Sequence, residues 1–203
     1  MGVDIEADEV VSHDTKHAVV NFATNRGVDA IVAEHEPLWL RSRLLGDPID
    51  WVVRHATCDV LLVDNLGYDR PERVALSGDG GPYPPLAVNV AEAIAVANGS
   101  DLSLRYPAGR ASTDQYERTI GDYQTELSAL RSVPVSVEPI RADGGRSSDP
   151  DVVVRRGSDE GLRGVLFDDR PVLPTPGCTT VTVYSHASRR PRFSRRLFER
   201  LTF

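Results

Sequence analysis

An aspartate among glycines is the feature of this sequence with the clearest chemical potential. Asp79 stands between Gly78, Gly80 and Gly81, directly after the apolar run of residues 73–77. Glycines of this kind form tight turns where other residues are strained. In parallel sheets, ligands bind beyond the carboxyl ends of the strands. Asp79 therefore either caps the turn or holds a polar ligand in the crevice.

The segments on either side of this turn must position Asp79. Residues 73–79 are predicted to form a buried strand and residues 101–106 a second one. The segment between them has a helical apolar stripe and ends at Gly99; the stripe comprises Leu86, Val90, Ala93, Ile94 and Ala97. Strand, turn, helix and strand in this order make a βαβ unit, which requires a parallel sheet with a right-handed crossover.

Alternating strands and helices are also predicted before this unit. Residues 3–11, 28–35 and 58–64 are typical of strands. A helix over 14–26 is capped by Ser12 or Asp14, ends at Gly27 and buries Val19, Val20, Phe22 and Ala23. Asp47-Pro48 opens a second helix, to residue 57, which buries Ile49, Val52, Val53 and Ala56.

After the unit, residues 116–130 keep one apolar face and predict a long helix. Strands follow at 133–140, 151–156 and 178–184, and Pro134 and Pro139 place the first of these at a sheet edge. The sequence predicts an α/β fold with a parallel sheet and flanking helices.

Two segments repeat. ATCDVLLV (56–63) matches PGCTTVTV (176–183), so that Cys58 and Cys178 each precede a strand. The second copy has shortened its helical connections. We divide the chain into residues 1–66, the second half of one repeat; 67–188, a degenerate second repeat; and 189–203, a basic tail.

Charge is unevenly distributed along the chain. The net charge is −7, but residues 189–203 contain six arginines and one glutamate, or +5, which leaves −12 for the first 188 residues. Lys16 is the single lysine, against 22 arginines. A salt-adapted prokaryote has such acidic, lysine-poor proteins, although high-GC coding has the same effect. The sequence lacks an apolar run that could span a bilayer, and its acidic start is unlike a signal peptide.

Other candidate residues have simple structural explanations. Asp47 serves as the N-cap of its helix, Cys58 and Cys178 as packing residues in a reducing cytosol, and His13 and His17 as a solvated helix face rather than a metal site. The sequence contains no evident catalytic constellation, and we expect a protein that is not an enzyme.

The chain resembles the universal stress protein family, particularly its tandem form. Residues 11–64 are similar to the second half of that fold, and residues 73–107, with the glycine turn, are similar to its opening. The resemblance implies a parallel sheet ordered 3-2-1-4-5, as in nucleotide-binding α-hydrolase-like folds. The chain is also similar to the cytosolic tails of archaeal and bacterial APC-type amino-acid transporters.

In nucleotide-binding members of the family, a G-x-x-G turn and a later G-[ST] hold the phosphates of ATP or AMP. The equivalent positions of the first copy are Ala33, Glu36, Gly46 and Asp47, so only Gly46 is retained. In the second copy they are Arg156, Asp159, Asp168 and Asp169, and none is retained. A carboxylate such as that of Asp47 occupies the amides that would bind a phosphate and repels it. Asp79 matches the family's adenine-contacting acid.

The resemblance therefore leaves two functions open. The first is a non-enzymatic regulatory module without a cofactor, in the cytosolic tail of an amino-acid transporter. The alternative is an adenine-nucleotide-binding protein with a rebuilt phosphate loop, whose candidate residues are Asp79, Gly80, Gly81, Gly46 and Asp47. We expect a homodimer on the inner face of the cell membrane. The arginine-rich tail contacts the transporter or anionic lipid, and no nucleic acid is expected.

Two packing predictions complete the sequence analysis. Strands 58–64 and 178–184 are apolar edges that pair with each other, within one chain or between two. The helices at 14–26 and 47–57 pack on the sheet begun by residues 73–79 and form one permuted domain, within the chain or across a dimer. The competing arrangement places two half-domains side by side.

Overall fold

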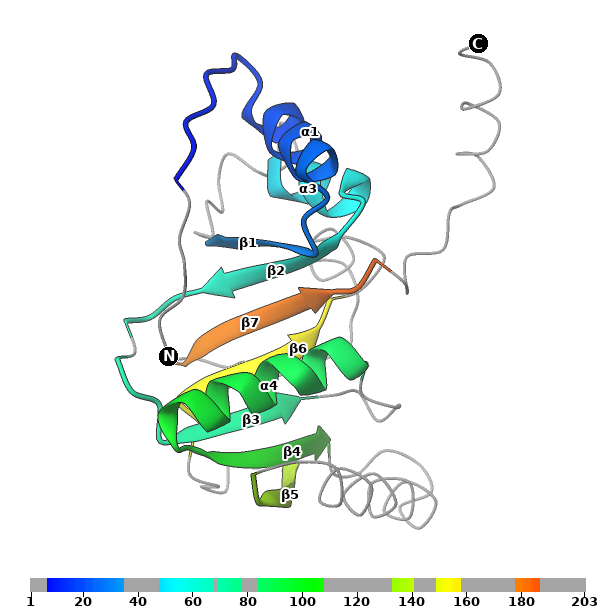
Figure 1. The fold of residues 1–203 in the computed structure, drawn as a ribbon. Coiled ribbons are helices and arrows are strands. Elements are labelled where there is room, and N and C mark those ends of the chain that lie inside the picture. The colour runs from blue at the N-terminus through cyan, green and yellow to red at the C-terminus, as the bar shows by residue number, and fades with distance from the viewer. Residues whose placement is uncertain are drawn as a thin grey trace, which may run out of the picture.

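The computed structural model describes residues 7–34, 48–67, 69–77, 84–107, 133–140, 149–157 and 178–186. In these ranges one seven-stranded sheet runs in the order β1-β2-β7-β6-β3-β4-β5 (Figure 1). Its strands are β1 (Ala30–Glu34), β2 (Asp59–Asp64), β3 (Arg73–Ser77), β4 (Asp101–Pro107), β5 (Val135–Ile140), β6 (Val152–Arg156) and β7 (Thr179–Tyr184). The described helices are α1 (Thr15–Arg26), α3 (Pro48–His55) and α4 (Pro85–Asn98).

Two parallel groups of strands share this sheet. Strands β3 to β7 are all parallel, and their spatial order β5-β4-β3-β6-β7 is the 3-2-1-4-5 order expected from the sequence. Strands β1 and β2 form a second parallel group. The two groups meet where β2 pairs antiparallel with β7. The chain is thus an α/β protein whose two unequal parts are fused through one pair of strands.

Side chains close both ends of the β2–β7 junction. Thr179 Oγ1 accepts a hydrogen bond from Leu66 N at 3.1 Å, just beyond the end of β2. At the other end, Asp59 Oδ1 accepts one from His186 N at 2.6 Å. Because each strand supplies one acceptor to the other, the antiparallel register is held at both ends.

Helix α4 covers one face of the larger strand group (Figure 1). Its seam consists of small side chains, Ala87, Ala91 and Ala95, which let the helix lie close to β3. The cluster beneath it also draws on β4, β5, β6 and β7 and includes Val74, Leu76, Leu102, Leu104, Val135, Val152, Val154, Val181 and Val183. Leu61 and Val63 of β2 pack against the same cluster, so this core crosses the junction.

Helices α1 and α3 cover the opposite face at the β1–β2 end. Val60 and Leu62 alternate with Leu61 and Val63 along β2 and therefore point to the other side. They pack with Ala23 of α1, with Val53 of α3 and with Ala56, which follows α3. Tyr184, at the end of β7, belongs to this second cluster and is buried.

Local capping explains where the helices begin and end. Asp14 caps α1 through His17 N at 3.4 Å, and a hydrogen bond from His17 holds the pKa of that exposed carboxyl below its usual value. Gly27 and Gly99 end α1 and α4 in the left-handed conformation. Trp51 of α3 stacks on His55 and meets the ring of His17 of α1, with ring centroids 4.1 and 4.2 Å apart.

Most of the elements predicted in these ranges are confirmed, with three corrections. Residues 7–11 do not form a strand. Val19 of α1 is exposed and lines an open groove together with residues of β1. In α4, Ala93 and Ala97 are exposed, and the buried seam lies one position further along at Ala87, Ala91 and Ala95. The flanking Leu86, Val90 and Ile94 are partly buried, as the close seam leaves them at its sides.

The permuted domain predicted within one chain is wrong. Val53 and Ala23 cluster with β2 and Tyr184, and this cluster contains no described residue of β3 or β4. Strands β6 and β7 lie between β2 and β3, so the first two helices cannot reach the central strands. The side-by-side arrangement is the one observed. The predicted pairing of strands 58–64 and 178–184 is confirmed, and it occurs within one chain.

Some predictions fall outside the described residues. These include the helix at 116–130, the part of the first strand before residue 7, and the basic tail 189–203. Cys58 and Cys178 are both buried directly before β2 and β7, as the repeat predicts. No helix in the described part of the chain is long and apolar enough to cross a membrane.

Candidate functional site

Strand β3 is the topological switch point of the larger strand group, because the chain adds strands first on one side of it and then on the other. From β3 the chain proceeds through α4 to β4, while β6 lies on its other side. Such a switch point opens a crevice outside the carboxyl ends of the two strands. Ser77 is the last residue of β3, and it lies in register with Arg155 of β6 and Arg105 of β4. The candidate site is built around these three residues.

A polar row crosses the sheet at this level. The register continues from Arg105 to Glu138 of β5 and from Arg155 to Thr182 of β7. Adjacent residues of the same strands, such as Leu76, Leu104 and Val154, lie in the core beneath α4. The row therefore points to the opposite face, away from α4. We call Glu138, Arg105, Ser77, Arg155 and Thr182 the polar row.

Both arginines of the row are held in place. Glu138 Oε2 accepts hydrogen bonds from Nε and Nη2 of Arg105, each at 3.2 Å. The Arg105 side chain is only 12% exposed, whereas that of Glu138 is 33% exposed. Arg155 donates from Nε to Thr182 Oγ1 at 3.0 Å. Because one carboxylate faces two guanidinium groups, the polar row carries a net positive charge beside Ser77.

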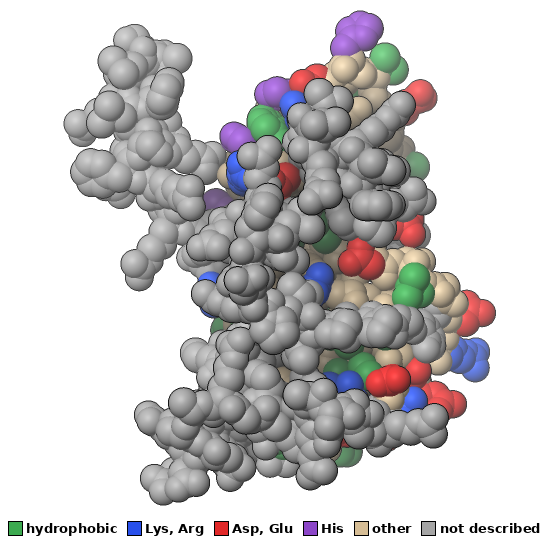
Figure 2. Space-filling view, turned by 180° about the vertical axis from the view of Figure 1, so that it is seen from behind, with side chains coloured by type: hydrophobic (Ala, Val, Ile, Leu, Met, Phe, Trp, Pro, Cys, Tyr) green, Lys and Arg blue, Asp and Glu red, His purple; other side chains and the backbone are tan. Residues whose placement is uncertain are grey.

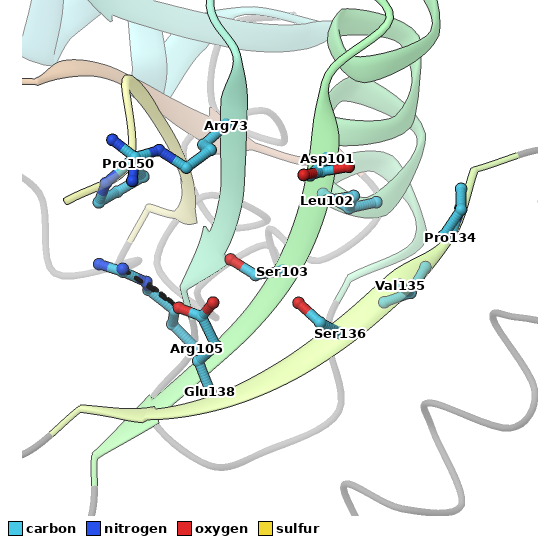
Figure 3. A pocket seen from close by; sticks show the side chains of 10 residues that line it. All are labelled: Arg73, Asp101, Leu102, Ser103, Arg105, Pro134, Val135, Ser136, Glu138 and Pro150. Atoms are coloured by element: carbon cyan, nitrogen blue, oxygen red, sulfur yellow. Dashed lines mark hydrogen bonds and ion pairs between the residues drawn. The ribbon is translucent and has the colours of Figure 1, made fainter. Parts of the chain in front are cut away.

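A cavity of about 390 Å³ adjoins the polar row (Figure 3). Arg105 and Glu138 line one end of it, Arg73 and Asp101 lie at the other, and Ser103 and Ser136 lie between them. Arg73 Nε is buried and has no hydrogen-bond partner in the described structure. A buried donor in this state costs about 1–3 kcal/mol. The cavity thus offers hydroxyl groups and both charges to a polar ligand.

The start of β3 is fixed by a neighbouring carboxylate. Asp151 Oδ2 accepts hydrogen bonds from the backbone N–H groups of Glu72 and Arg73, at 2.7 and 3.0 Å. These bonds tie the beginnings of β3 and β6 together. The relative position of Ser77 and Arg155 at the other ends of these strands follows from that register.

The residues singled out in the sequence lie outside the described part of the chain. Asp79, Gly80 and Gly81 follow Ser77 after one residue, and Gly46 and Asp47 immediately precede α3. Sequence reasoning missed the polar row itself. The sequence pattern that could have indicated it is the alternation of polar and apolar residues. Ser103 and Arg105 are polar positions in one strand, and Ser136 and Glu138 are polar positions in the next.

The first part of the chain has no equivalent crevice among the described strands. Strand β1 occupies the position that β6 has in the second part, but only β2 is recorded beside it. One wall of the site is therefore missing there. Within the described residues, no group of three or more His, Cys, Asp or Glu side chains could hold a metal ion.

Charged side chains of both signs are visible from the side of the polar row. Figure 2, seen from behind, shows basic and acidic side chains next to each other on the lower part of the molecule. Histidines gather at the upper end, where α1 and α3 lie. The two ends of this face therefore differ in chemistry.

Comparison with known proteins assigns a family model to part of the sequence. Residues 2–64 match the model of the universal stress protein family. This match covers less than a third of the chain, and it ends before β3. No curated protein shows significant similarity to the sequence.

Solved structures share the fold over most of the chain. A universal stress protein from Archaeoglobus fulgidus superimposes with a TM-score of 0.57 and 11% identity, covering 82% of this chain and 64% of its own. This chain therefore spans less than two thirds of that protein's length. A putative universal stress protein from Pseudomonas aeruginosa gives 0.51 and 18% identity, covering 87% of this chain and 68% of its own.

A transporter domain has the same fold. The cytoplasmic domain of a prokaryotic cation chloride cotransporter superimposes with a TM-score of 0.56 and 13% identity, covering 84% of this chain and 70% of its own. At these identities the comparisons establish the fold alone. The chain has the α/β fold of universal stress protein structures, with sequence similarity to the family model confined to residues 2–64.

Proposed function

We propose that this chain is a non-enzymatic regulatory module of a membrane transporter, and specifically of an amino-acid transporter. One observation carries the proposal: the fold of this chain, two unequal parts fused by β2 and β7 into one sheet, is similar to that of a transporter's cytoplasmic domain over 84% of the chain. Because paired strands join the two parts, their relative orientation is fixed. Such a module can transmit a conformational change from one part to the other.

The chemistry of the polar row supports a binding role rather than catalysis. Its arginines are held by Glu138 and Thr182, and the row contains no histidine or second carboxylate to act as a general base for the hydroxyl groups of Ser77 and Thr182. Such a row can hold an anion without transforming it. The proposal includes no cofactor.

The basic tail supports a position at the inner face of the cell membrane. Residues 189–203 carry +5, and four apolar residues, Phe193, Leu197, Phe198 and Leu201, lie among the arginines. This mixture is suited to anionic lipid surfaces. The −12 of the preceding residues disfavours nucleic acid, which is also anionic.

Amino-acid uptake tests the proposal directly. Inside-out membrane vesicles that contain the transporter without this chain are assayed with labelled amino acids, with and without the purified chain. We expect at least a twofold change in the transport rate of one substrate class. A variant with the tail arginines replaced by glutamine should lose the effect on transport. The control variant Arg54→Gln and Arg70→Gln, which removes two arginines outside the tail, should retain it. Unchanged transport of every amino acid tested would contradict the proposal.

An adenine-nucleotide-binding protein is the second candidate, and the switch point favours it. The turn containing Asp79, Gly80 and Gly81 follows Ser77 directly, and Arg105 and Arg155 lie on either side of Ser77. The loop containing Gly46 and Asp47 opposes phosphate binding. We therefore expect ATP and AMP to bind with Kd weaker than about 10 μM, which corresponds to about −7 kcal/mol.

Calorimetric titration with ATP, AMP and cyclic dinucleotides separates the two candidates. Submicromolar binding that is lost in the variant Asp79→Ala would favour the nucleotide-binding protein. The double variant Glu36→Gly and Asp47→Ser rebuilds part of the family's phosphate loop, and an increase in ATP affinity is expected. Release of inorganic phosphate by the wild-type chain would refute the absence of enzymatic activity.

A further inference from the structure

Two of the charged side chains that line the cavity beside the polar row compensate each other, and two do not. Arg105 and Glu138 form an ion pair with a separation of 3.2 Å. Arg73 and Asp101 also line the cavity and are register partners at the beginnings of β3 and β4. Neither of their side chains forms an ion pair with a described residue. The cavity therefore contains one uncompensated charge of each sign.

The direction of the Arg73 side chain keeps its charge away from Asp101. In Figure 3 this side chain extends from β3 towards Pro150, on the side away from Asp101. Its Nε atom is buried and has no hydrogen-bond partner among the described residues. Most buried polar groups in proteins are hydrogen-bonded. An acceptor oxygen from a bound molecule would satisfy this donor.

Hydroxyl groups line the middle of the cavity. Ser103 and Ser136 are register partners on β4 and β5, and both line the cavity. Figure 3 shows them between Asp101 and the pair of Arg105 and Glu138. A serine hydroxyl can donate one hydrogen bond and accept others. These two groups can therefore contact either a negative or a positive group of a ligand.

The lining residues select the charge of the ligand. Two arginines and two acids are found among the described lining residues, and their formal charges sum to zero. A polyphosphate or a simple cation would leave one sign of charge without a partner. None of the described lining residues is aromatic, whereas quaternary ammonium ligands are bound by aromatic cages. The best match is a small molecule with one carboxylate and one ammonium group that carries N–H donors.

We propose that the cavity binds a free amino acid in its zwitterionic form. The ligand carboxylate accepts hydrogen bonds from the guanidinium group of Arg73, and the ligand ammonium group donates to the carboxylate of Asp101. Both uncompensated charges are then paired, and the hydroxyl groups of Ser103 and Ser136 complete the contacts. A volume of about 390 Å³ is in the range of small-molecule sites. The proposal rests on the binding role in the function proposed above, and it names the class of ligand.

Calorimetric titration of the full chain tests the proposal. The probes are the proteinogenic L-amino acids and a series of increasing length, β-alanine, γ-aminobutyrate and 5-aminovalerate. We expect at least one of them to bind with a Kd below about 1 mM. If every probe binds more weakly than this, the proposal is refuted.

A matched ligand tests the contact with Asp101 without any change to the protein. The N-trimethylated derivative of the best probe keeps the carboxylate and the positive charge but has no N–H donor. It should bind at least tenfold more weakly than the parent compound. Equal affinity of the two compounds would contradict the assigned contact.

Two variants locate the ligand. Arg73→Gln and Asp101→Asn should each weaken binding at least tenfold, and Asp101 is exposed, so its exchange leaves the core intact. The same two exchanges on α3, Arg54→Gln and Asp50→Asn, should leave the affinity unchanged. Thermal unfolding confirms that each variant is folded before titration. Unchanged affinity in a folded Arg73→Gln or Asp101→Asn variant would exclude this cavity as the site.

The transport assay separates this proposal from the proposed function. Amino-acid binding that is lost in Asp101→Asn, together with unchanged transport, would support the site and contradict the transporter role. A change in transport without amino-acid binding would refute the site alone.

Discussion

The same face of the sheet is apolar in one part of the molecule and largely polar in the other. Along β1 and β2, the face that carries Val60 and Leu62 is apolar and is covered by α1 and α3. On the same side of β3 to β7, the polar row replaces most of the apolar residues, with Ala75, Val153 and Cys178 as a small remaining cluster. Among the described residues, helices cover this face along β1 and β2 alone. An apolar sheet face must be covered, whereas a face with polar side chains can bind polar ligands.

The variants with the largest expected effects test whether the two parts of the protein unfold as one cooperative unit or as two. Leu104→Ala removes a side chain from the core beneath α4, and Leu62→Ala removes one from the core beneath α1 and α3. Since both leucines are buried, we expect losses of about 3–5 and 2–3 kcal/mol in the free energy of unfolding.

Denaturant unfolding followed by circular dichroism measures both losses. If the β2–β7 junction couples the two parts, each variant shifts one shared transition. Two separate transitions, each sensitive to one variant, would show that the parts unfold independently. The surface variant Val96→Ala is the control, with a change below about 0.5 kcal/mol.

The next largest effect lies at the junction. A Cβ atom on Gly157 would lie only 2.2–2.5 Å from ring atoms of Tyr184. We expect Gly157→Ala to destabilise the protein by about 1–3 kcal/mol, since the ring belongs to the packed cluster under α1 and α3.

A double-mutant cycle identifies this contact as the cause. Thermal unfolding of Gly157→Ala is compared in the wild-type and Tyr184→Leu backgrounds. The cost of the alanine should fall when the ring is absent. An equal cost in both backgrounds would point to the backbone instead.

The polar row should contribute less to stability than either core. Replacement of both Arg105 and Glu138 by methionine, with the two single variants, gives their coupling energy. We expect about 0.5–1 kcal/mol, because Glu138 is partly exposed and solvent screens the pair. The pair of Arg54 and Asp50 on α3, 2.6 Å apart, is the matched control, with about 0.3–0.5 kcal/mol expected. A coupling no larger than that of the control would indicate that the row is not preorganised.

The smallest effect appears at high pH. Burial raises the pKa of Tyr184 above its ordinary value of 10.0. The unfolded chain therefore loses this proton first, and the stability that the neutral ring confers is lost as pH rises through and above that value. We expect Tyr184→Phe to reduce the pH dependence of unfolding between about pH 9.5 and 11.5. Identical alkaline profiles for the two proteins would contradict this assignment.

Local sequence patterns predict most of the described elements. Asp14 caps α1, Gly27 and Gly99 end α1 and α4, and the runs before Ser77 and after Cys58 form strands. These features depend on neighbouring residues, whose hydrogen bonds and apolar spacing act over one or two helical turns. The repeat around Cys58 and Cys178 likewise marks the two strands that meet at the junction. The turn predicted at residues 78–81 lies outside the described residues, and the polar row at the end of β3 was not anticipated.

Tertiary structure alone decides which strands are neighbours. Residues 60 and 184 pair across the junction although more than a hundred residues separate them, and their alternation specifies a face but not a partner. The permuted arrangement satisfied the same apolar patterns and was wrong. Only the observed strand order brings Glu138, Arg105, Ser77, Arg155 and Thr182 into one row. Burial selects the face, whereas the pairing of distant strands places these side chains side by side.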